Sequence, residues 1–225
     1  MKKRVLVVAV HPDDETLGCG GTLLKHIDNG DKVYWLIITK ANQKITSIPN
    51  IEIKQAKYCH NVAIAYGFHG WKQLRFLTTE LDTYPLNKII EEISSYIKEV
   101  EPEILYLHHH TDVHSDHKVA FDAIYSCTKS FRFPYIKKIL TFETLSETEF
   151  APAYAMNVFV PNVFNDITPY MEKKLDILKL FTTEQMVEPL PRALSSIRAL
   201  GRYRGSRIGM EYGEAFMLLY ENLNL

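Results

Sequence analysis

The sequence has little cysteine and no long apolar run. Its three cysteines are Cys19, Cys59 and Cys127, and no two of them form a C-x-x-C pair, which argues against a disulfide framework and favours a reducing compartment. The longest apolar runs, such as residues 5–10, are far shorter than the roughly 20 residues that a membrane-spanning helix needs. We therefore expect a cytoplasmic protein that is not embedded in a membrane.

The sequence also lacks a charge imbalance, internal repeats and low-complexity linkers. With 26 basic and 27 acidic residues its net charge is −1, which gives no electrostatic reason to expect a nucleic-acid partner. A hydrophobic share of 46% over 225 residues can build a sizeable core, and α/β proteins of this length run as one domain. We expect a single domain over residues 1–225, and the sequence leaves open whether it forms a homo-oligomer.

The apolar pattern predicts a layered α/β fold with a parallel sheet. Residues 4–10 form a β-branched run without alternation, typical of a strand buried on both faces. Residues 16–29 have helical spacing, and residues 33–39 form a second buried strand, so the segment reads as a strand–helix–strand unit. The same reasoning predicts helices at 53–66, 86–99, 114–129, 167–181 and 193–203, and strands at 74–77, 104–107, 136–142, 155–160 and 215–220.

Two clusters of acidic and histidine side chains follow predicted strands. Residues 11–15 read H-P-D-D-E directly after the first strand, and residues 108–117 read H-H-H-T-D-V-H-S-D-H after the strand at 104–107. In open α/β sheets, ligands bind beyond the carboxyl ends of the strands, where loops converge. We therefore expect the two clusters to contribute to one site.

These residue types are typical of a catalytic zinc site. Imidazole and carboxylate groups are common zinc ligands, usually three from the protein with water in the open position. His114 and His117 are three positions apart, so at a helix start they share a face. Asp13 and Asp14 cannot both face one ion with equal geometry, which leaves one carboxylate free for proton transfer.

The sequence resembles the PIG-L or LmbE-like deacetylase family in these two clusters. The matching segments read A-V-H-P-D-D-E at residues 9–15 and H-S-D-H at residues 114–117. The resemblance extends to L-G-C-G-G-T at 17–22, Y-R-G at 203–205 and Y-G-E-A-F at 212–216, and so covers most of the chain. It implies a Rossmann-like layered sandwich, with a mostly parallel central sheet and helices on both faces, that hydrolyses N-acetyl groups on glucosamine-containing substrates.

Carried over position by position, the resemblance implies a role for each residue of the two motifs. The Zn²⁺ ligands would be His11, Asp14 and His117. Asp13 would be the general base, which takes a proton from the attacking water. His114 would be protonated and would stabilise the oxyanion that forms from the amide carbonyl.

The resemblance also bears on the residues around the motifs. Asp116 is expected to hydrogen-bond a histidine, fixing its tautomer and raising its pKa. Asp82 is similar to a family acid that binds sugar hydroxyls. Arg204 lies in a basic stretch that could contact a substrate anion and that runs from Arg192 to Arg207. Where family members often carry an arginine that holds the substrate, this chain has Lys54.

Several of these features also have a purely structural interpretation. The H-P-D-D segment could be a proline-set turn with an Asp helix cap. His108, His109 and His110 are expected to be structural, and Asp112 either orients a metal ligand or caps a turn. The glycines at 18–21 lie too far after the strand for a dinucleotide-binding loop, and they are expected to let a helix approach the sheet closely.

The sequence therefore predicts a zinc-dependent hydrolase that removes an acetyl group from the amine of an N-acetylated amino sugar of the N-acetylglucosamine type. One alternative is a regulatory or binding domain without deacetylase turnover, in which Asp13 and Asp14 hold Mg²⁺. Another is a catalytically idle binding protein that keeps the fold and the metal. Histidine is a poor Mg²⁺ ligand, so the metal content separates the hydrolase from the magnesium-dependent domain.

Overall fold

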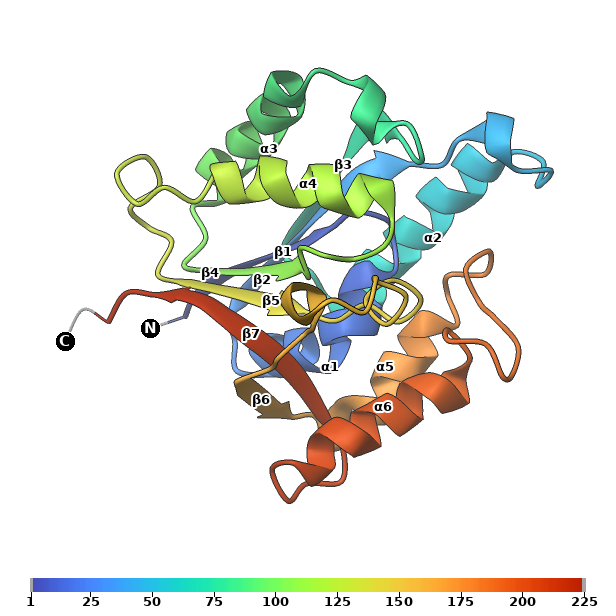
Figure 1. Cartoon of the computed structure of the whole chain (residues 1–225), viewed down its shortest axis with the longest axis vertical. Coiled ribbons are helices and arrows are strands. Elements are labelled where there is room, and N and C mark those ends of the chain that lie inside the picture. The colour runs from blue at the N-terminus through green and yellow to red at the C-terminus, as the bar shows by residue number, and fades with distance from the viewer. Residues whose placement is uncertain (1, 224–225) are drawn as a thin grey trace.

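A computed structural model describes residues 2–223, which form a seven-stranded sheet in the order β3-β2-β1-β4-β5-β7-β6. The elements are β1 (Arg4–Ala9), α1 (Asp14–Asp28), β2 (Lys32–Lys40), α2 (Ile51–Tyr66), β3 (Gly70–Leu77), α3 (Leu86–Val100), β4 (Ile104–His108), α4 (Ser115–Ser126), β5 (Lys138–Phe142), β6 (Val163–Asp166), α5 (Met171–Leu178), α6 (Leu194–Ser206) and β7 (Gly213–Glu221). Figure 1 shows α3 and α4 on one side of the sheet and α1, α5 and α6 on the other.

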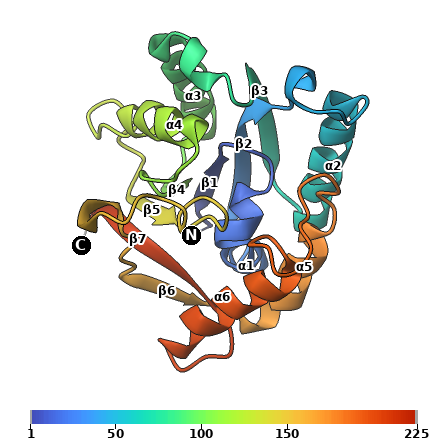
Figure 2. The same ribbon diagram turned by 45° about the vertical axis from the view of Figure 1, so that its right-hand side comes forward.

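The sheet is parallel from β3 to β5; at one edge β7 pairs antiparallel with β5, and β6 pairs antiparallel with β7. Apolar side chains of β1 alternate between two cores. One core packs against α1, α2, α5 and α6, and the other against α3 and α4. Figure 2 shows α3 and α4 across the sheet from α1, α5 and α6. Burial on both faces explains the unbroken apolar run of β1. The predicted mostly parallel sheet with helices on both faces is confirmed.

The predicted strand at 155–160 is wrong. In the described chain, Ala155–Asn157 is a single 3-10 turn, and the side chains of Met156, Val158 and Val160 are exposed. The apolar residues of this segment resemble a strand in sequence, but here they belong to a largely exposed loop, in which the backbone N–H of Val160 donates to Sδ of Met217 in β7. The strand that pairs with β7 is β6, at Val163–Asp166, whose polar residues gave no strand signal.

Other elements keep their predicted type with shifted ends. The weak strand predicted at 74–77 begins at Gly70. The helix predicted at 167–181 is shorter, because a 3-10 turn at Thr168–Tyr170 precedes α5 and the helix ends at Leu178.

Helix α1 packs unusually close to the sheet, and its glycines allow this. A Cβ atom added at Gly18 would lie 2.0 Å from Cδ2 of Phe142. The helix is kinked at Cys19, and the backbone N–H groups of Gly21 and Thr22 donate to the Glu214 carboxylate at 2.9 and 2.7 Å. The glycine cluster therefore serves close packing, as the sequence predicts.

A buried ion pair completes this contact. Lys174 of α5 lies 2.8 Å from Glu214 of β7 and also donates to the carbonyl of Leu17, so three segments are held around the start of α1. This start of α1 carries the first acidic cluster.

Strands β1 and β4 are neighbours and run parallel, with Val5 opposite Ile104 and Val7 opposite Tyr106. Because parallel neighbours end at the same edge, the loops after β1 and β4 meet there. Within residues 2–223, no helix is both long and apolar enough to cross a membrane.

Candidate active site

Three side chains from the two clusters converge at this edge of the sheet. Nε2 of His117 lies 3.2 Å from Nδ1 of His11 and 3.4 Å from Oδ2 of Asp14. One ligand atom from each residue lies within 4.8 Å of the other two. His117 and Asp14 are buried and His11 is partly exposed, so the cluster opens to solvent on one side.

Two further carboxylates hold the far sides of the two imidazole rings. Nε2 of His11 lies 3.1 Å from Oδ2 of Asp116, and Nδ1 of His117 lies 2.9 Å from Oδ2 of Asp112. When each carboxylate accepts an N–H from its histidine, the nitrogens that face each other carry lone pairs. A bound cation would relieve the repulsion between these lone pairs, so the residues present fit a metal ion.

The charge states of His117 and Asp14 also suit a cation. Burial lowers the pKa of His117 to about 4, so its ring is neutral at pH 7. Although burial opposes ionisation, the nearby His117 and His11 hold the pKa of Asp14 below its usual value. The Asp14 carboxylate also accepts backbone N–H groups of Val10 and His11 at 2.9 and 2.8 Å, which fixes its position.

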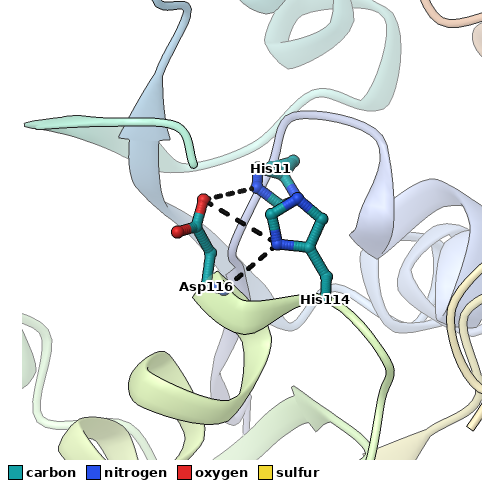
Figure 3. A group of neighbouring side chains, drawn as sticks. All are labelled: His11, His114 and Asp116. Atoms are coloured by element: carbon teal, nitrogen blue, oxygen red, sulfur yellow. Dashed lines mark hydrogen bonds and ion pairs between the residues drawn. The ribbon is translucent and has the colours of Figure 1, made fainter. Parts of the chain in front are cut away.

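A second group of neighbouring ligand types contains His11, His114 and Asp116 (Figure 3). In this group the Asp116 carboxylate already accepts backbone N–H groups, from Thr79 at 2.7 Å and from Leu81 at 3.1 Å. Its lone pairs are therefore used within the protein. We interpret Asp116 as a residue that orients His11, and His11, Asp14 and His117 as the group better suited to a metal.

His114 is the N-cap residue of α4, and its ring lies 4.5 Å from the ring of His11 between centroids. Its Nδ1 accepts the backbone N–H of Asp116 at 3.1 Å, which leaves the ring proton on Nε2. Burial and the neighbouring His11 lower the pKa of His114 to about 4. These surroundings favour a neutral ring that donates from Nε2, whereas the sequence led us to expect a protonated one.

Asp13 has a strained backbone and an unusual partner. Its φ of 124° is a conformation that residues other than glycine rarely adopt, and such strain collects at functional sites. Although Asp13 stands at the N-cap position of α1, within the described chain its side chain makes no capping hydrogen bond. It lies 3.0 Å from Nη1 of Arg192 instead. The interpretation of H-P-D-D as a simple Asp cap therefore does not describe this side chain.

Burial and a neighbouring cation have opposite effects on the pKa of Asp13. Burial raises the pKa of Asp13 well above its usual value, and the guanidinium of Arg192 acts in the other direction. Arg192 also lies 3.4 Å from Glu184.

Burial and the nearby Asp14 carboxylate raise the pKa of Glu147 to about 7. Sequence reasoning missed Glu147 and Glu184, and it recognised Arg192 only as part of a basic stretch, since these residues carry no motif.

Residues of the cluster line a cavity of about 310 Å³. The candidate catalytic and ligand residues that line it are His11, Asp13, Asp14 and His114. The rest of the lining comes mainly from the segments 39–55, 144–147 and 183–192. This volume is at the lower end of the range typical of small-molecule sites.

Two residues predicted to bind substrate lie elsewhere. Asp82 is exposed in the 3-10 turn Leu81–Thr83 and does not line this cavity. Arg204 makes two hydrogen bonds of 2.7 Å to Glu143 and also lies outside it. Their roles stay predictions. Lys54 is exposed on α2 and does not line the cavity either.

The histidine run has other partners. Nε2 of His108 lies 2.7 Å from the carbonyl oxygen of His117, and Nε2 of His109 lies 3.3 Å from that of Asn157. Within residues 2–223, neither they nor His110 belong to a group that could hold a metal. Asp112 contacts both His117 and the Thr148 hydroxyl, so it orients an imidazole rather than only capping a turn.

Comparisons with known proteins show the family and the fold. The family described as PIG-L, GlcNAc-PI de-N-acetylase, matches residues 6–128. The chain is 28% identical over 184 residues to an uncharacterized deacetylase, YaiS, of Escherichia coli K12, covering 79% of this chain and 90% of that protein. It superposes on N,N′-diacetylchitobiose deacetylase from Pyrococcus horikoshii with a TM-score of 0.75 at 20% identity, covering 97% and 84% of the two chains.

The fold is also shared with an enzyme of another class. The 4-carboxy-2-hydroxymuconate hydratase of Pseudomonas putida superposes with a TM-score of 0.74 at 15% identity, over 100% of this chain and 99% of that one. At such identities the likeness shows the fold alone, and function has to be argued from the site. The family match is more specific, because it covers more than half of the chain and contains both clusters. The chain therefore belongs to the PIG-L family of de-N-acetylases.

Proposed function

We propose that this protein is a zinc-dependent hydrolase that removes the acetyl group from the amine of an N-acetylated amino sugar. The observation that carries the proposal is the convergence of His11, Asp14 and His117, with Asp13 beside them and a cavity of about 310 Å³ in front. Family membership supports the reaction class. The donor set of two imidazoles and one carboxylate supports zinc.

His11, Asp14 and His117 would hold the ion. A zinc ion supplies a Lewis acid that acidifies water and polarises a carbonyl group. Asp112 and Asp116 keep the two histidines in the tautomer that presents a lone pair to the metal. This arrangement supports a site that is set before substrate arrives.

Asp13 and His114 would handle the protons and the developing charge. Asp13 takes a proton from the attacking water and passes it to the amine as the C–N bond breaks. His114 donates from Nε2 to the amide oxygen, on which negative charge develops. The ion pair with Arg192 favours the ionised form of Asp13, which a base requires.

Metal identity tests the main alternative. A magnesium-dependent regulatory domain would use hard oxygen ligands, whereas two of the three converging donors here are imidazole nitrogens. We expect the purified protein to contain zinc, or a similar transition metal, in a 1:1 ratio and to bind Mg²⁺ only weakly. Magnesium as the sole bound metal would favour the regulatory alternative.

The test of the reaction is acetate release from N-acetylglucosamine derivatives. We expect Asp13→Asn to lower kcat by about 10²–10⁴-fold, the usual contribution of a general base, while zinc binding is retained. Asp28→Asn, an exposed carboxylate on the same helix, is the matched control and should be fully active. Full activity of zinc-loaded Asp13→Asn would show that Asp13 is not the base.

A further inference from the structure

Part of the wall of the active-site cavity is apolar. Its apolar residues are Ala41, Ile45, Ile48 and Ile51, from the loop after β2 to the first residue of α2, and Asn42 and Thr46 of the same stretch also line the cavity. Ile51 is buried, but Ile45 is 55% exposed and Ile48 is half-buried, so the wall continues from the interior to the mouth of the cavity. Apolar side chains that extend to the mouth of a polar catalytic site are available to contact a ligand.

Hydrogen bonds within the same segment hold this wall in place. The Gln43 side chain donates to the carbonyl of Ile48 at 3.0 Å and accepts the backbone N–H of Ile51 at 3.1 Å. The Asn42 side chain accepts the backbone N–H of Lys44 at 3.1 Å. These hydrogen bonds therefore fix the backbone conformation of the segment that carries the isoleucines.

The charged residues that line the cavity do not favour an anionic ligand. Of the described residues that line it, Arg192 is the only lysine or arginine. Arg192 is already engaged by two carboxylates, Asp13 at 3.0 Å and Glu184 at 3.4 Å. Glu147 and Asp14 add further acidic groups, so even with a divalent cation bound the cavity has no surplus positive charge.

We propose that the wall formed by Ala41, Ile45, Ile48 and Ile51 is a subsite for an uncharged, apolar substituent at the anomeric position of the amino sugar. An apolar group would be removed from water against the isoleucines. An anionic group would lose its hydration beside carboxylates and find no free cation. This inference rests on the proposed deacetylase function, and it names the substrate class of that same site.

The test compares three N-acetylglucosaminides that differ only in this substituent: the methyl glycoside, the hexyl glycoside and the 1-phosphate, each as both anomers. Amine release by the zinc-loaded protein gives kcat/KM for each. We expect the hexyl glycoside to exceed the methyl glycoside by about tenfold or more, since a few buried methylenes give discrimination of that size. The 1-phosphate should be the poorest of the three.

Substitutions in the wall test whether it causes the preference for the hexyl glycoside. Ile45→Ser and Ile48→Ser should each lower kcat/KM for the hexyl glycoside about threefold to tenfold more than kcat/KM for the methyl glycoside. Ile53→Ser is the matched control, because Ile53 is 70% exposed on α2 and does not line the cavity. Ile45→Arg should raise activity on the 1-phosphate, because it adds a cation that no carboxylate holds.

The outcomes separate this inference from the proposed function. If the methyl glycoside is hydrolysed but the hexyl glycoside is no better, or if the 1-phosphate is preferred, the apolar subsite is overturned and the deacetylase function stands. If no glycoside is hydrolysed although zinc is bound, the proposed function fails and the subsite fails with it. A hexyl preference that Ile45→Ser and Ile48→Ser leave intact also overturns the subsite.

Discussion

Replacing Arg192 by methionine should move the pH dependence of catalysis. Arg192 lies 3.0 Å from the carboxylate of Asp13, which is 3% exposed and whose pKa burial raises. Removing the guanidinium takes away the group that favours the ionised form. The pKa of Asp13 therefore rises further, less of the base is ionised at a given pH, and activity at neutral pH falls but recovers as the pH is raised.

The size of the shift follows from the geometry. Two unit charges about 4 Å apart near a protein surface interact by about 4 kcal/mol at an effective dielectric constant of about 20, which is an upper limit here. The Arg192 side chain is 22% exposed and is shared with Glu184, so solvent and the second carboxylate reduce its effect on Asp13. We expect a shift of about 1–3 pKa units, the usual effect of an arginine beside an aspartate.

The assay is kcat/KM for the methyl glycoside across the pH range, with zinc saturating. The acid limb of the profile should move to higher pH by about 1–3 units in Arg192→Met and by less in Arg192→Lys. Arg198→Met is the matched control, because it removes an arginine whose ion pair with Glu172 lies on the surface. Its profile should coincide with that of the unmodified protein.

Two results would refute this reasoning. An acid limb that does not move in Arg192→Met would show that the guanidinium does not set the ionisation of the base. A loss of activity by the same factor at every pH would show that Arg192 acts only through the position of Asp13 or of the substrate.

Three further predictions concern the structure that supports the site. Asp112→Asn removes the carboxylate that orients His117, so we expect about 10–100-fold weaker zinc binding in competition with a chelator. Lys174→Met leaves the buried Glu214 carboxylate without its cation, so the free energy of unfolding in urea should fall by about 3–5 kcal/mol, and adding Glu214→Gln should restore part of it. Gly18→Ala forces a methyl group into an aromatic ring and should lower the free energy of unfolding by about 1–3 kcal/mol.

The sequence predicted the central part of the fold well. The unbroken apolar run of β1 and the helical spacing of α1 come from local periodicity, which a chain carries wherever it folds. Local reasoning failed at residues 155–160, because an apolar segment forms a strand only where its backbone pairs with another strand, and β7 pairs with residues 163–166 instead. It also missed β6, whose pairing with β7 outweighs the weak strand propensity of Asn165 and Asp166.

The sequence by itself determined the chemistry of the candidate site. The ligand types His11, Asp14 and His117, with Asp13 beside them, lie in short motifs at strand ends, and parallel neighbouring strands bring such ends together.

Only the tertiary structure decided which residues orient the site side chains and shift their pKa values. The contact between Arg192 and Asp13 joins positions 179 residues apart, and that between Asp116 and His11 joins positions 105 apart. No local periodicity encodes such pairs, because they depend on how whole elements pack. The same packing makes Ile45 and Ile48, which lie in a loop without a sequence motif, part of the cavity lining.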